Sequence, residues 1–259
     1  MKPKNEKQAK RFIEKVNSQI GKHIYDHNLI EEGDHILLGL SGGKDSLILL
    51  ETLAMRKNYM PIKFEMTAVY VQLTNIPYQS DTDYLRKICE TNKVPFKVEE
   101  CTPPIEDRDK PLCFICSWNR RKQLFALAEK YKCNKLALGH HRDDAIETLL
   151  MNMIYHGSIS SLPSKLSMFN GDLKLIRPLL FSREEDLIQY AEIKQFELQK
   201  KVCPYGENAK RAKLKELVKM LDEWYPGAKT NLFNSMNKIF TEYLPTSNEL
   251  KDTTKDNLC

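Results

Sequence analysis

The chain has 259 residues, enough to bury a sizeable core in one large domain or in one domain with a small appendage. Apolar residues make up 41% and charged residues 29% of it, as in soluble globular proteins. No apolar run approaches the roughly 20 residues that a membrane span requires, and the N-terminal residues lack the apolar centre of a secretory signal. We therefore expect no membrane insertion and a cytoplasmic location. The net charge of +5 is too small to indicate nucleic-acid binding by itself.

Apolar, β-branched or aromatic runs alternate along the chain with segments of helical pattern. After a helix over residues 5–26, the strand-like runs are Ile36–Leu40, Phe64–Val71, Phe96–Glu99, Leu136–Gly139 and Leu173–Ile176. The intervening helical segments are Asp45–Arg56, Ser80–Asn92, Trp118–Lys132 and Asp143–Tyr155. This alternation predicts an α/β fold with a doubly wound parallel sheet of Rossmann-like type, in which ligands bind beyond the carboxyl ends of the strands.

Four regions follow from this pattern. An N-terminal helical segment (1–30) precedes the α/β domain (31–182), and a helical extension (183–247) follows, interrupted at Tyr225-Pro226-Gly227. The polar tail 248–259 is expected to be disordered. Two irregular stretches, Cys101–Leu112 and Ser158–Asn170, are expected to be active-site or RNA-facing loops.

The first motif, Ser41-Gly42-Gly43-Lys44-Asp45-Ser46, directly follows the strand-like run 36–40 and begins a helix. Glycines allow positive φ and bring backbone N–H groups close to an anion, which the N-terminus of a helix also favours. Lys44 adds a positive charge, whereas the carboxylate of Asp45 beside phosphates requires a divalent cation between them. The motif is not a Walker A loop and predicts a site for a nucleotide and Mg²⁺, with Asp45 as a metal ligand. The alternative is a Gly-Gly turn with Asp45 and Ser46 as helix caps.

The second motif, Gly139-His140-His141-Arg142-Asp143-Asp144, follows another strand-like run and opens another helix. The predicted fold places it at the same edge of the sheet as the first motif. We expect His140 or His141 to face a nucleotide or a base, and Asp143 or Asp144 to hold the metal or cap the helix. Glu147, one turn later, can complete a capping box with Asp144.

Seven cysteines without a secretory signal indicate thiols or metal ligands rather than disulfides. Cys113 and Cys116 form a C-x-x-C pair between a proline-rich loop and a basic helix, and Cys203 lies in a loop-like context before Pro and Gly. Three such thiolates can bind three irons of a four-iron, four-sulfur cluster and leave one iron open. A structural zinc or unrelated buried thiols are the alternatives. Cys89 and Cys133 are expected in the core.

In their order along the chain, these motifs resemble those of the TtcA-type tRNA 2-thiocytidine synthetases, which belong to the PP-loop ATP pyrophosphatases. Three further stretches carry the resemblance, which covers roughly residues 10–245: Arg120-Arg121, Ile176-Arg177-Pro178-Leu179 and Trp224-Tyr225-Pro226-Gly227. The resemblance implies that ATP adenylates C2 of cytidine 32 in the tRNA anticodon loop with release of pyrophosphate. Sulfur carried by an iron–sulfur cluster then displaces AMP.

The resemblance also implies roles for individual residues. Lys44, Asp45 and Asp144 are the expected catalytic residues, Ser41–Ser46, Gly139 and His140 the nucleotide site, and Cys113, Cys116 and Cys203 the ligands of a 4Fe–4S cluster. Many relatives have a second C-x-x-C where this chain has Cys203-Pro204-Tyr205-Gly206, so one cysteine remains there. The expected partners are tRNA and a sulfur donor such as a cysteine desulfurase, and a homodimer is possible.

Basic residues outnumber acidic ones between Lys194 and Lys219. Two further basic residues, Arg120 and Arg121, lie shortly after the cysteine pair. The expected RNA contacts are Arg120, Arg121, Lys200, Lys201, Lys210 and Arg211. A solvated helix face is the structural alternative. Two other functions fit the motifs: a cluster-free adenylating ligase resembling tRNA lysidine synthetase, which would not require the cysteines, and a non-catalytic protein that binds nucleotide or RNA.

Overall fold

The computed structural model describes residues 5–74, 80–102, 112–198 and 209–245, and it describes the backbone but not the side chains of 112–117 and 209–210. Several predicted features lie outside these described residues. They are the side chains of Cys113, Cys116 and Lys210, the residues Lys200, Lys201 and Cys203, and the tail 248–259.

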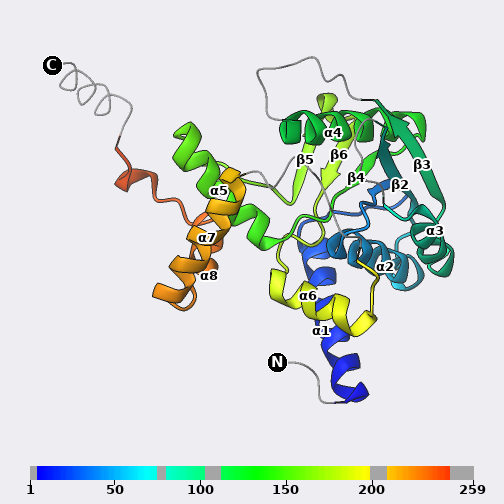
Figure 1. Ribbon diagram of the computed structural model, residues 1–259, viewed down its shortest axis with the longest axis horizontal. Coiled ribbons are helices and arrows are strands. Elements are labelled where there is room, and N and C mark those ends of the chain that lie inside the picture. The colour runs from blue at the N-terminus through cyan, green and yellow to red at the C-terminus, as the bar shows by residue number, and fades with distance from the viewer. Residues whose placement is uncertain (1–4, 75–79, 103–111, 199–208, 246–259) are drawn as a thin grey trace.

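Six strands form one sheet in the order β3-β2-β1-β4-β6-β5 (Figure 1). They are β1 (His35–Gly39), β2 (Glu65–Leu73), β3 (Phe96–Cys101), β4 (Lys135–Ala137), β5 (Lys165–Met168) and β6 (Leu173–Ile176). All neighbouring pairs are parallel except β5 with β6, so the predicted α/β class is confirmed. The prediction of an irregular stretch over Ser158–Asn170 is wrong, because β5 lies within it. As an edge strand with exposed and half-buried side chains, β5 lacks the apolar run that marks the central strands.

The helices are α1 (Glu6–Asp26), α2 (Lys44–Tyr59), α3 (Thr82–Thr91), α4 (Leu112–Lys130), α5 (Arg142–His156), α6 (Glu184–Lys194), α7 (Ala209–Trp224) and α8 (Ala228–Ser235). Two short 3₁₀ turns cover Phe169–Gly171 and Thr241–Tyr243. Helix α4 begins before Trp118, so the backbone of the C-x-x-C pair belongs to the first turns of the helix and not to a loop ahead of it. Gly227, with φ of 104°, separates α7 from α8 at the predicted break.

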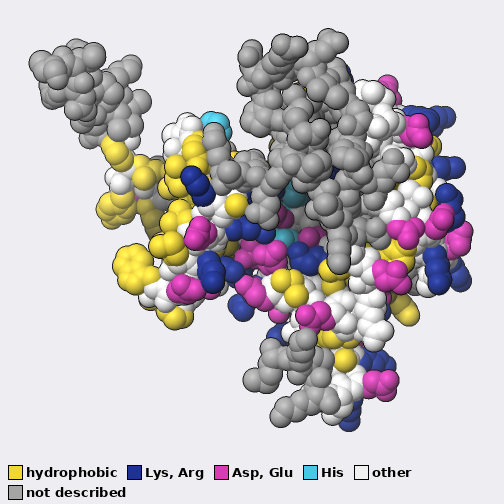
Figure 2. Space-filling model, viewed as in Figure 1, with side chains coloured by type: hydrophobic (Ala, Val, Ile, Leu, Met, Phe, Trp, Pro, Cys, Tyr) yellow, Lys and Arg dark blue, Asp and Glu magenta, His cyan; other side chains and the backbone are white. Residues whose placement is uncertain are grey.

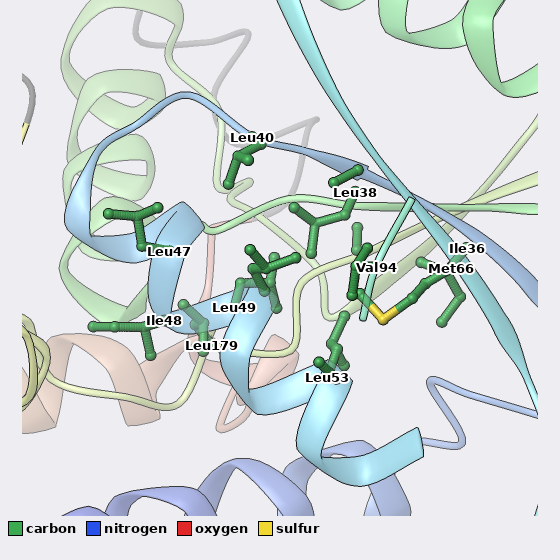
Figure 3. Close-up of a cluster of buried hydrophobic side chains, with 14 of the residues drawn as sticks. Ile36, Leu38, Leu40, Leu47, Ile48, Leu49, Leu53, Met66, Val94 and Leu179 are labelled. Atoms are coloured by element: carbon green, nitrogen blue, oxygen red, sulfur yellow. The ribbon is translucent and has the colours of Figure 1, made fainter. Parts of the chain in front are cut away.

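Helices cover both faces of the sheet, and Figure 3 shows the apolar cluster on one of these faces, with Ile36 and Leu38 of β1 in it. Ile36 and Leu38 are fully buried against α1, α2, α3 and α6, whereas Leu37 between them is fully buried against α4 on the other face. A strand buried on both faces must be apolar throughout, which is why this run was recognisable in the sequence.

Helices α5, α7 and α8 form a third layer of packing beside the sheet (Figure 1). Ile146 of α5 packs in one apolar cluster with Leu214 of α7 and Phe233 of α8. Exposed apolar side chains also gather on this part of the molecule, including Trp224 at 84% exposure, and charged side chains of both signs lie toward the centre of the same face (Figure 2). Among the described residues, no helix combines the length and the apolar character needed to cross a membrane.

The position of the site follows from the strand order. β1 pairs with β4, with Leu37 opposite Leu136, although β2 and β3 lie between them in the chain. The chain leaves β1 toward β2 on one side and leaves β4 toward β6 on the other. The strand order therefore reverses between β1 and β4, and ligand sites in such sheets lie beyond the carboxyl ends at this point.

At the opposite edge, Lys135 anchors β4 through a fully buried ammonium group. Its Nζ donates a hydrogen bond to the Leu29 carbonyl at 2.9 Å and pairs with Glu31 at 2.7 Å and Asp34 at 2.5 Å. Asp34 is itself 3% exposed, so removal of Lys135 would leave a buried carboxylate without its cation.

We predict that Lys135→Ala lowers the free energy of unfolding by about 3–5 kcal/mol, the cost of breaking a buried ion pair. Urea denaturation measures this loss. Lys57→Ala is the matched control because its ion pair with Glu65 is largely exposed, and we expect a loss of at most about 1 kcal/mol. Equal losses in the two variants would contradict the structural role of Lys135.

Candidate active site

The loop between β1 and α2 forms a short cradle of backbone and hydroxyl groups. Gly42 has a φ of 75°, a conformation that favours glycine, and Gly43 is the N-cap of α2. The Ser46 hydroxyl donates to the Gly43 carbonyl at 2.9 Å and accepts from the Ser41 amide at 3.1 Å. The prediction that Asp45 and Ser46 cap α2 is wrong, because both lie in the first turn after Gly43. This leaves the Asp45 side chain free for another role.

Gly139 brings the second motif into direct contact with this cradle. A Cβ atom at position 139 would lie 3.0 Å from the backbone carbon of Asp45 and 3.2 Å from the Ser46 amide nitrogen. Contacts this short are tighter than most that a real Cβ atom makes, so glycine favours this approach of the residues after β4 to the start of α2. The loops enclose a cavity of about 320 Å³, a size suited to a small-molecule ligand. Residues from both motifs and from α4 line it, among them Ser41, Gly43, Asp45, Ser46, Gly139, His140, Asp144, Arg120 and Arg121.

Asp45 carries a buried oxygen without a partner. Its Oδ2 accepts from Lys44 Nζ at 3.2 Å, but its Oδ1 is buried and has no hydrogen bond among the described residues. Burial raises the pKa of Asp45, and the charges of Lys44 and His141 oppose this shift. A buried oxygen of this kind is costly unless something binds it.

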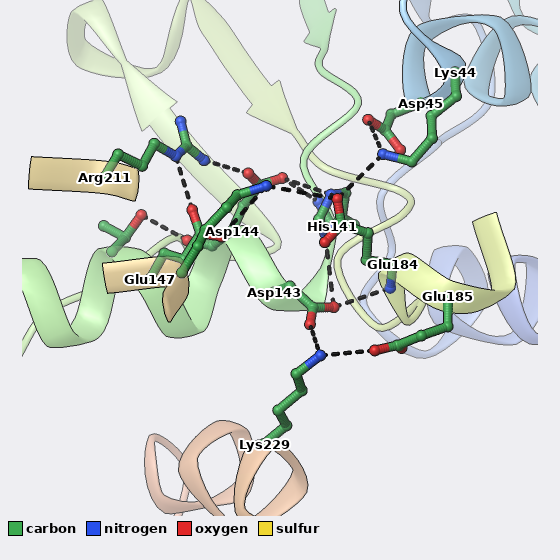
Figure 4. A network of polar contacts seen from close by, with 12 residues as sticks. Lys44, Asp45, His141, Asp143, Asp144, Glu147, Glu184, Glu185, Arg211 and Lys229 are labelled. Atoms are coloured by element: carbon green, nitrogen blue, oxygen red, sulfur yellow. Dashed lines mark hydrogen bonds and ion pairs between the residues drawn. The ribbon is translucent and has the colours of Figure 1, made fainter. Parts of the chain in front are cut away.

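Lys44 is held by carboxylates at the edge of the cavity (Figure 4). Besides Asp45, it contacts Glu184 Oε1 at 3.4 Å at the start of α6. Burial lowers the pKa of Lys44, but Asp45 and Glu184 outweigh this effect, so that its pKa is raised and the side chain is charged.

Asp144 has both oxygens engaged, unlike Asp45. Oδ2 accepts from the His141 amide at 3.0 Å, and Oδ1 pairs with Arg211 of α7. Glu147 pairs with the same guanidinium at 2.8 Å. The predicted capping box between Asp144 and Glu147 is therefore wrong, because Asp144 caps α5 through His141 and Glu147 turns toward α7. Burial alone would raise the pKa of Asp144, but His141 and Arg211 outweigh this effect. The pKa is therefore lowered, and the carboxylate is ionised.

Asp143 joins two other elements to α5. Its Oδ2 accepts the amide of Glu184 at 2.9 Å, which caps α6, and its Oδ1 lies 3.1 Å from Lys229 Nζ on α8 (Figure 4). Lys215 of α7 adds a contact with Glu184 at 3.7 Å. The acidic start of α5 is thus neutralised by cations from the two C-terminal helices.

The structure brings most of the predicted site residues together. The loop 41–46, Gly139, His140, Asp144, Arg120 and Arg121 adjoin one cavity. Arg211 lies beside it, with its guanidinium held by Asp144 and Glu147. Arg120 and Arg121 follow the backbone of Cys113 and Cys116 by one to two turns of α4, and among the described side chains these two arginines and Leu124 bring α4 to the cavity.

Three cysteines are described with side chains, and all three are buried. Burial raises the pKa of the Cys89 thiol to about 12 and that of Cys133 to about 11, so both remain protonated at neutral pH. Cys89 and Cys133 belong to the apolar core clusters on the two faces of the sheet, as expected from the sequence.

The donor set around the cavity fits Mg²⁺ bound together with phosphates. Among the described residues, no cluster of three or more His, Cys, Asp or Glu side chains could hold a metal. Mg²⁺ at nucleotide sites is held by one or two carboxylates and by the phosphates themselves. The unpartnered Oδ1 of Asp45, beside the glycine cradle, is suited to this.

Comparison with known proteins identifies the family. Residues 3–220 match the family described as a PP-loop domain. A tRNA-cytidine(32) 2-sulfurtransferase from Shewanella sediminis is 39% identical over 228 residues, which are 86% of this chain and 72% of the relative. One from Idiomarina loihiensis is 36% identical over 95% of this chain and 84% of its own. The chain belongs to the tRNA-cytidine(32) 2-sulfurtransferase family of PP-loop proteins.

A solved structure agrees with this family. The U34-tRNA thiolase NcsA from Methanococcus maripaludis, determined with its 4Fe–4S cluster, superposes with a TM-score of 0.77. It is 25% identical, and the match covers 92% of this chain and 81% of that one. The resemblance inferred from the motifs is confirmed, and the fold of this sulfurtransferase-family chain is that of a tRNA thiolase.

Sequence reasoning missed two residues of the site. Glu184 begins a run of three acidic residues, which is a signal for a helix start but not for a contact with Lys44. Arg177 belongs to a motif that carried the resemblance, but only the structure places its side chain against His140.

We predict that Gly139→Ala weakens ATP binding by about tenfold or more, because the added methyl displaces the start of α2. Isothermal titration with ATP measures the affinity, and circular dichroism checks the fold.

Gly33→Ala is the control. Gly33 lies outside the cavity lining and has no atom within 4 Å of an added methyl, so with its φ of 78° the variant strains the backbone without touching the cradle. Unchanged affinity in Gly139→Ala would show that the nucleotide does not use this cradle.

Proposed function

We propose that this protein is an ATP-dependent tRNA sulfurtransferase that replaces the C2 oxygen of cytidine 32 in the anticodon loop with sulfur. Membership in the tRNA-cytidine(32) 2-sulfurtransferase family carries this proposal. The glycine cradle and the unpartnered oxygen of Asp45 support its ATP-dependent half.

The first step is adenylation of the base. The C2 oxygen attacks the α-phosphorus of ATP, the bond to pyrophosphate breaks, and the base then bears AMP. The C2 oxygen alone is a poor leaving group, whereas the same oxygen bonded to AMP leaves readily. The cradle formed by Ser41–Ser46 binds the phosphates with Lys44, Asp45 Oδ1 holds Mg²⁺, and Gly139 and His140 complete the nucleotide site. Asp144 is the third proposed catalytic residue. It lies in the first turn of α5, where its contacts with Arg211 and the His141 amide favour the ionised carboxylate.

The second step exchanges the activated oxygen for sulfur. A sulfur nucleophile attacks C2, the C–O bond breaks, and AMP leaves with the former base oxygen. A 4Fe–4S cluster, when bound, supplies the sulfur through its open iron. Its proposed ligands are Cys113, Cys116 and Cys203, whereas Cys89 and Cys133 belong to the apolar core and do not line the cavity. NcsA, which carries such a cluster, has the same fold.

The RNA must reach the cavity with one base unpaired. Basic side chains that bind the backbone hold it there, while loops isolate the base. The proposed contacts are Arg120, Arg121, Lys200, Lys201, Lys210 and Arg211. Arg211 would also keep α7 against the site through Asp144. A cysteine desulfurase as sulfur donor and a homodimer complete the proposal.

Thiolation of tRNA by the purified protein tests the proposed function. We expect 2-thiocytidine in tRNA nucleosides after anaerobic reconstitution with iron and sulfide and incubation with ATP, Mg²⁺ and tRNA, as measured by mass spectrometry. Cys113→Ser or Cys203→Ser should abolish the product, whereas Cys89→Ala should retain it. Full activity of the ligand variants would indicate a cluster-free ligase instead.

Asp45→Asn tests the metal site separately. We expect release of pyrophosphate with tRNA to fall by about a hundredfold, because the neutral amide no longer balances Mg²⁺ at the phosphates. A coupled pyrophosphate assay over a range of Mg²⁺ concentrations measures this change. Asp26→Asn on the surface of α1 serves as the charge-matched control. If both variants retained wild-type rates, Asp45 would not be the metal ligand.

A further inference from the structure

Arg177 is a buried cation whose side chain ends at the candidate active site. It directly follows β6, is 6% exposed, and donates from Nη1 to the Pro163 carbonyl at 2.6 Å. From Nε it donates to Nδ1 of His140 at 3.3 Å. β4 pairs with β6, with Ala137 opposite Ile176, so the two residues extend from the carboxyl ends of neighbouring strands.

This contact determines where the proton of His140 resides. A guanidinium group has only donors, so Nδ1 of His140 must accept with its lone pair. A neutral imidazole with a bare Nδ1 carries its proton on Nε2. Burial lowers the pKa of Arg177 to about 10, which leaves it charged at neutral pH.

The surroundings keep the ring of His140 neutral. Burial lowers the pKa of His140 to about 4; the negative charge of Asp144 opposes this shift, and the positive charges of Arg177, Arg211 and Arg121 reinforce it. At neutral pH the ring therefore has one acceptor, which Arg177 occupies, and one donor.

The donor is available to a ligand. His140 lines the cavity together with the Ser41–Ser46 loop, Arg120 and Arg121, and its Nε2 has no hydrogen-bond partner among the described residues. A neutral N–H group with its acceptor side blocked can only donate, so it cannot remove a proton from the substrate.

We propose that Arg177 is a positioning residue that fixes His140 as a neutral imidazole protonated on Nε2, which donates a hydrogen bond to an acceptor oxygen of the bound substrate. The acceptor is a phosphoryl oxygen of the nucleotide or the carbonyl oxygen of the base. This inference rests on the proposed function for the identity of the substrate, but the state of the ring does not depend on it.

Nitrogen NMR of the histidine rings in the nucleotide-free protein tests the tautomer directly. The His140→Gln spectrum assigns the resonances. We expect a pyrrole-type signal for Nε2 and a pyridine-type signal for Nδ1 of His140 at neutral pH. In Arg177→Lys, which keeps the charge but loses the Nε donor, we expect a mixture of tautomers. A protonated ring, or a proton on Nδ1 in the wild-type protein, would overturn the inference even if the protein is a sulfurtransferase.

Kinetics test the donor itself. The side-chain amide of Gln places its NH₂ group where imidazole has Nε2, whereas that of Asn places it nearer to Nδ1. We expect His140→Gln to retain adenylation within about tenfold of wild type and His140→Asn to lose at least a further tenfold, each tenfold being about 1.4 kcal/mol. Arg183→Gln, an exposed arginine at the start of α6, is the control and should be unchanged. Equal losses in the Gln and Asn variants would contradict a donor at Nε2.

Two measurements distinguish the acceptor oxygens. If His140→Asn weakens ATP binding without tRNA, the acceptor is a phosphoryl oxygen. If ATP binding is unchanged and pyrophosphate release with tRNA slows, the acceptor is the base oxygen. If neither changes, His140 does not donate to the substrate and the inference fails.

Discussion

The parallel pairing of β1 with β4 is the constraint on which the site depends. It places two strand-to-helix loops, distant in the chain, side by side at the point where the strand order reverses. Because Gly139 has no Cβ atom, its backbone packs directly against the backbone of Asp45, where a Cβ atom would lie only 3.0 Å away. The start of α2 and the loop that leads into α5 are therefore in contact. The cavity, the free oxygen of Asp45 and the position of His140 all follow from this contact.

A second consequence is electrostatic. Acidic side chains accumulate where α5 and α6 begin, and their mutual repulsion in a partly buried site must be balanced. Arg211, Lys215 and Lys229 supply the balance from α7 and α8. The C-terminal helices therefore contact the acidic residues that begin α5 and α6 beside the cavity.

Much of this arrangement could be predicted from the sequence. Runs such as Ile36–Leu40 are buried on both faces and therefore read as central strands, and glycine-containing motifs after them locate the carboxyl ends. The edge strand β5 could not be recognised, because its exposed side chains carry no apolar pattern. Caps were assigned to the wrong partners because cap preferences are local. Asp143 caps α6 from another element, and Glu147 turns to Arg211, and both contacts depend on tertiary structure.

Oxygen transfer from the base to AMP tests the central claim most directly. A tRNA that carries a heavy oxygen isotope at C2 of cytidine 32 is incubated with ATP, Mg²⁺ and the reconstituted protein, and the AMP and pyrophosphate are analysed by mass spectrometry. If the cavity at Asp45 and His140 adenylates the base, all of the label lost from the tRNA appears in AMP. Label in pyrophosphate or in water, with thiolated tRNA formed, would contradict activation of the base by this site.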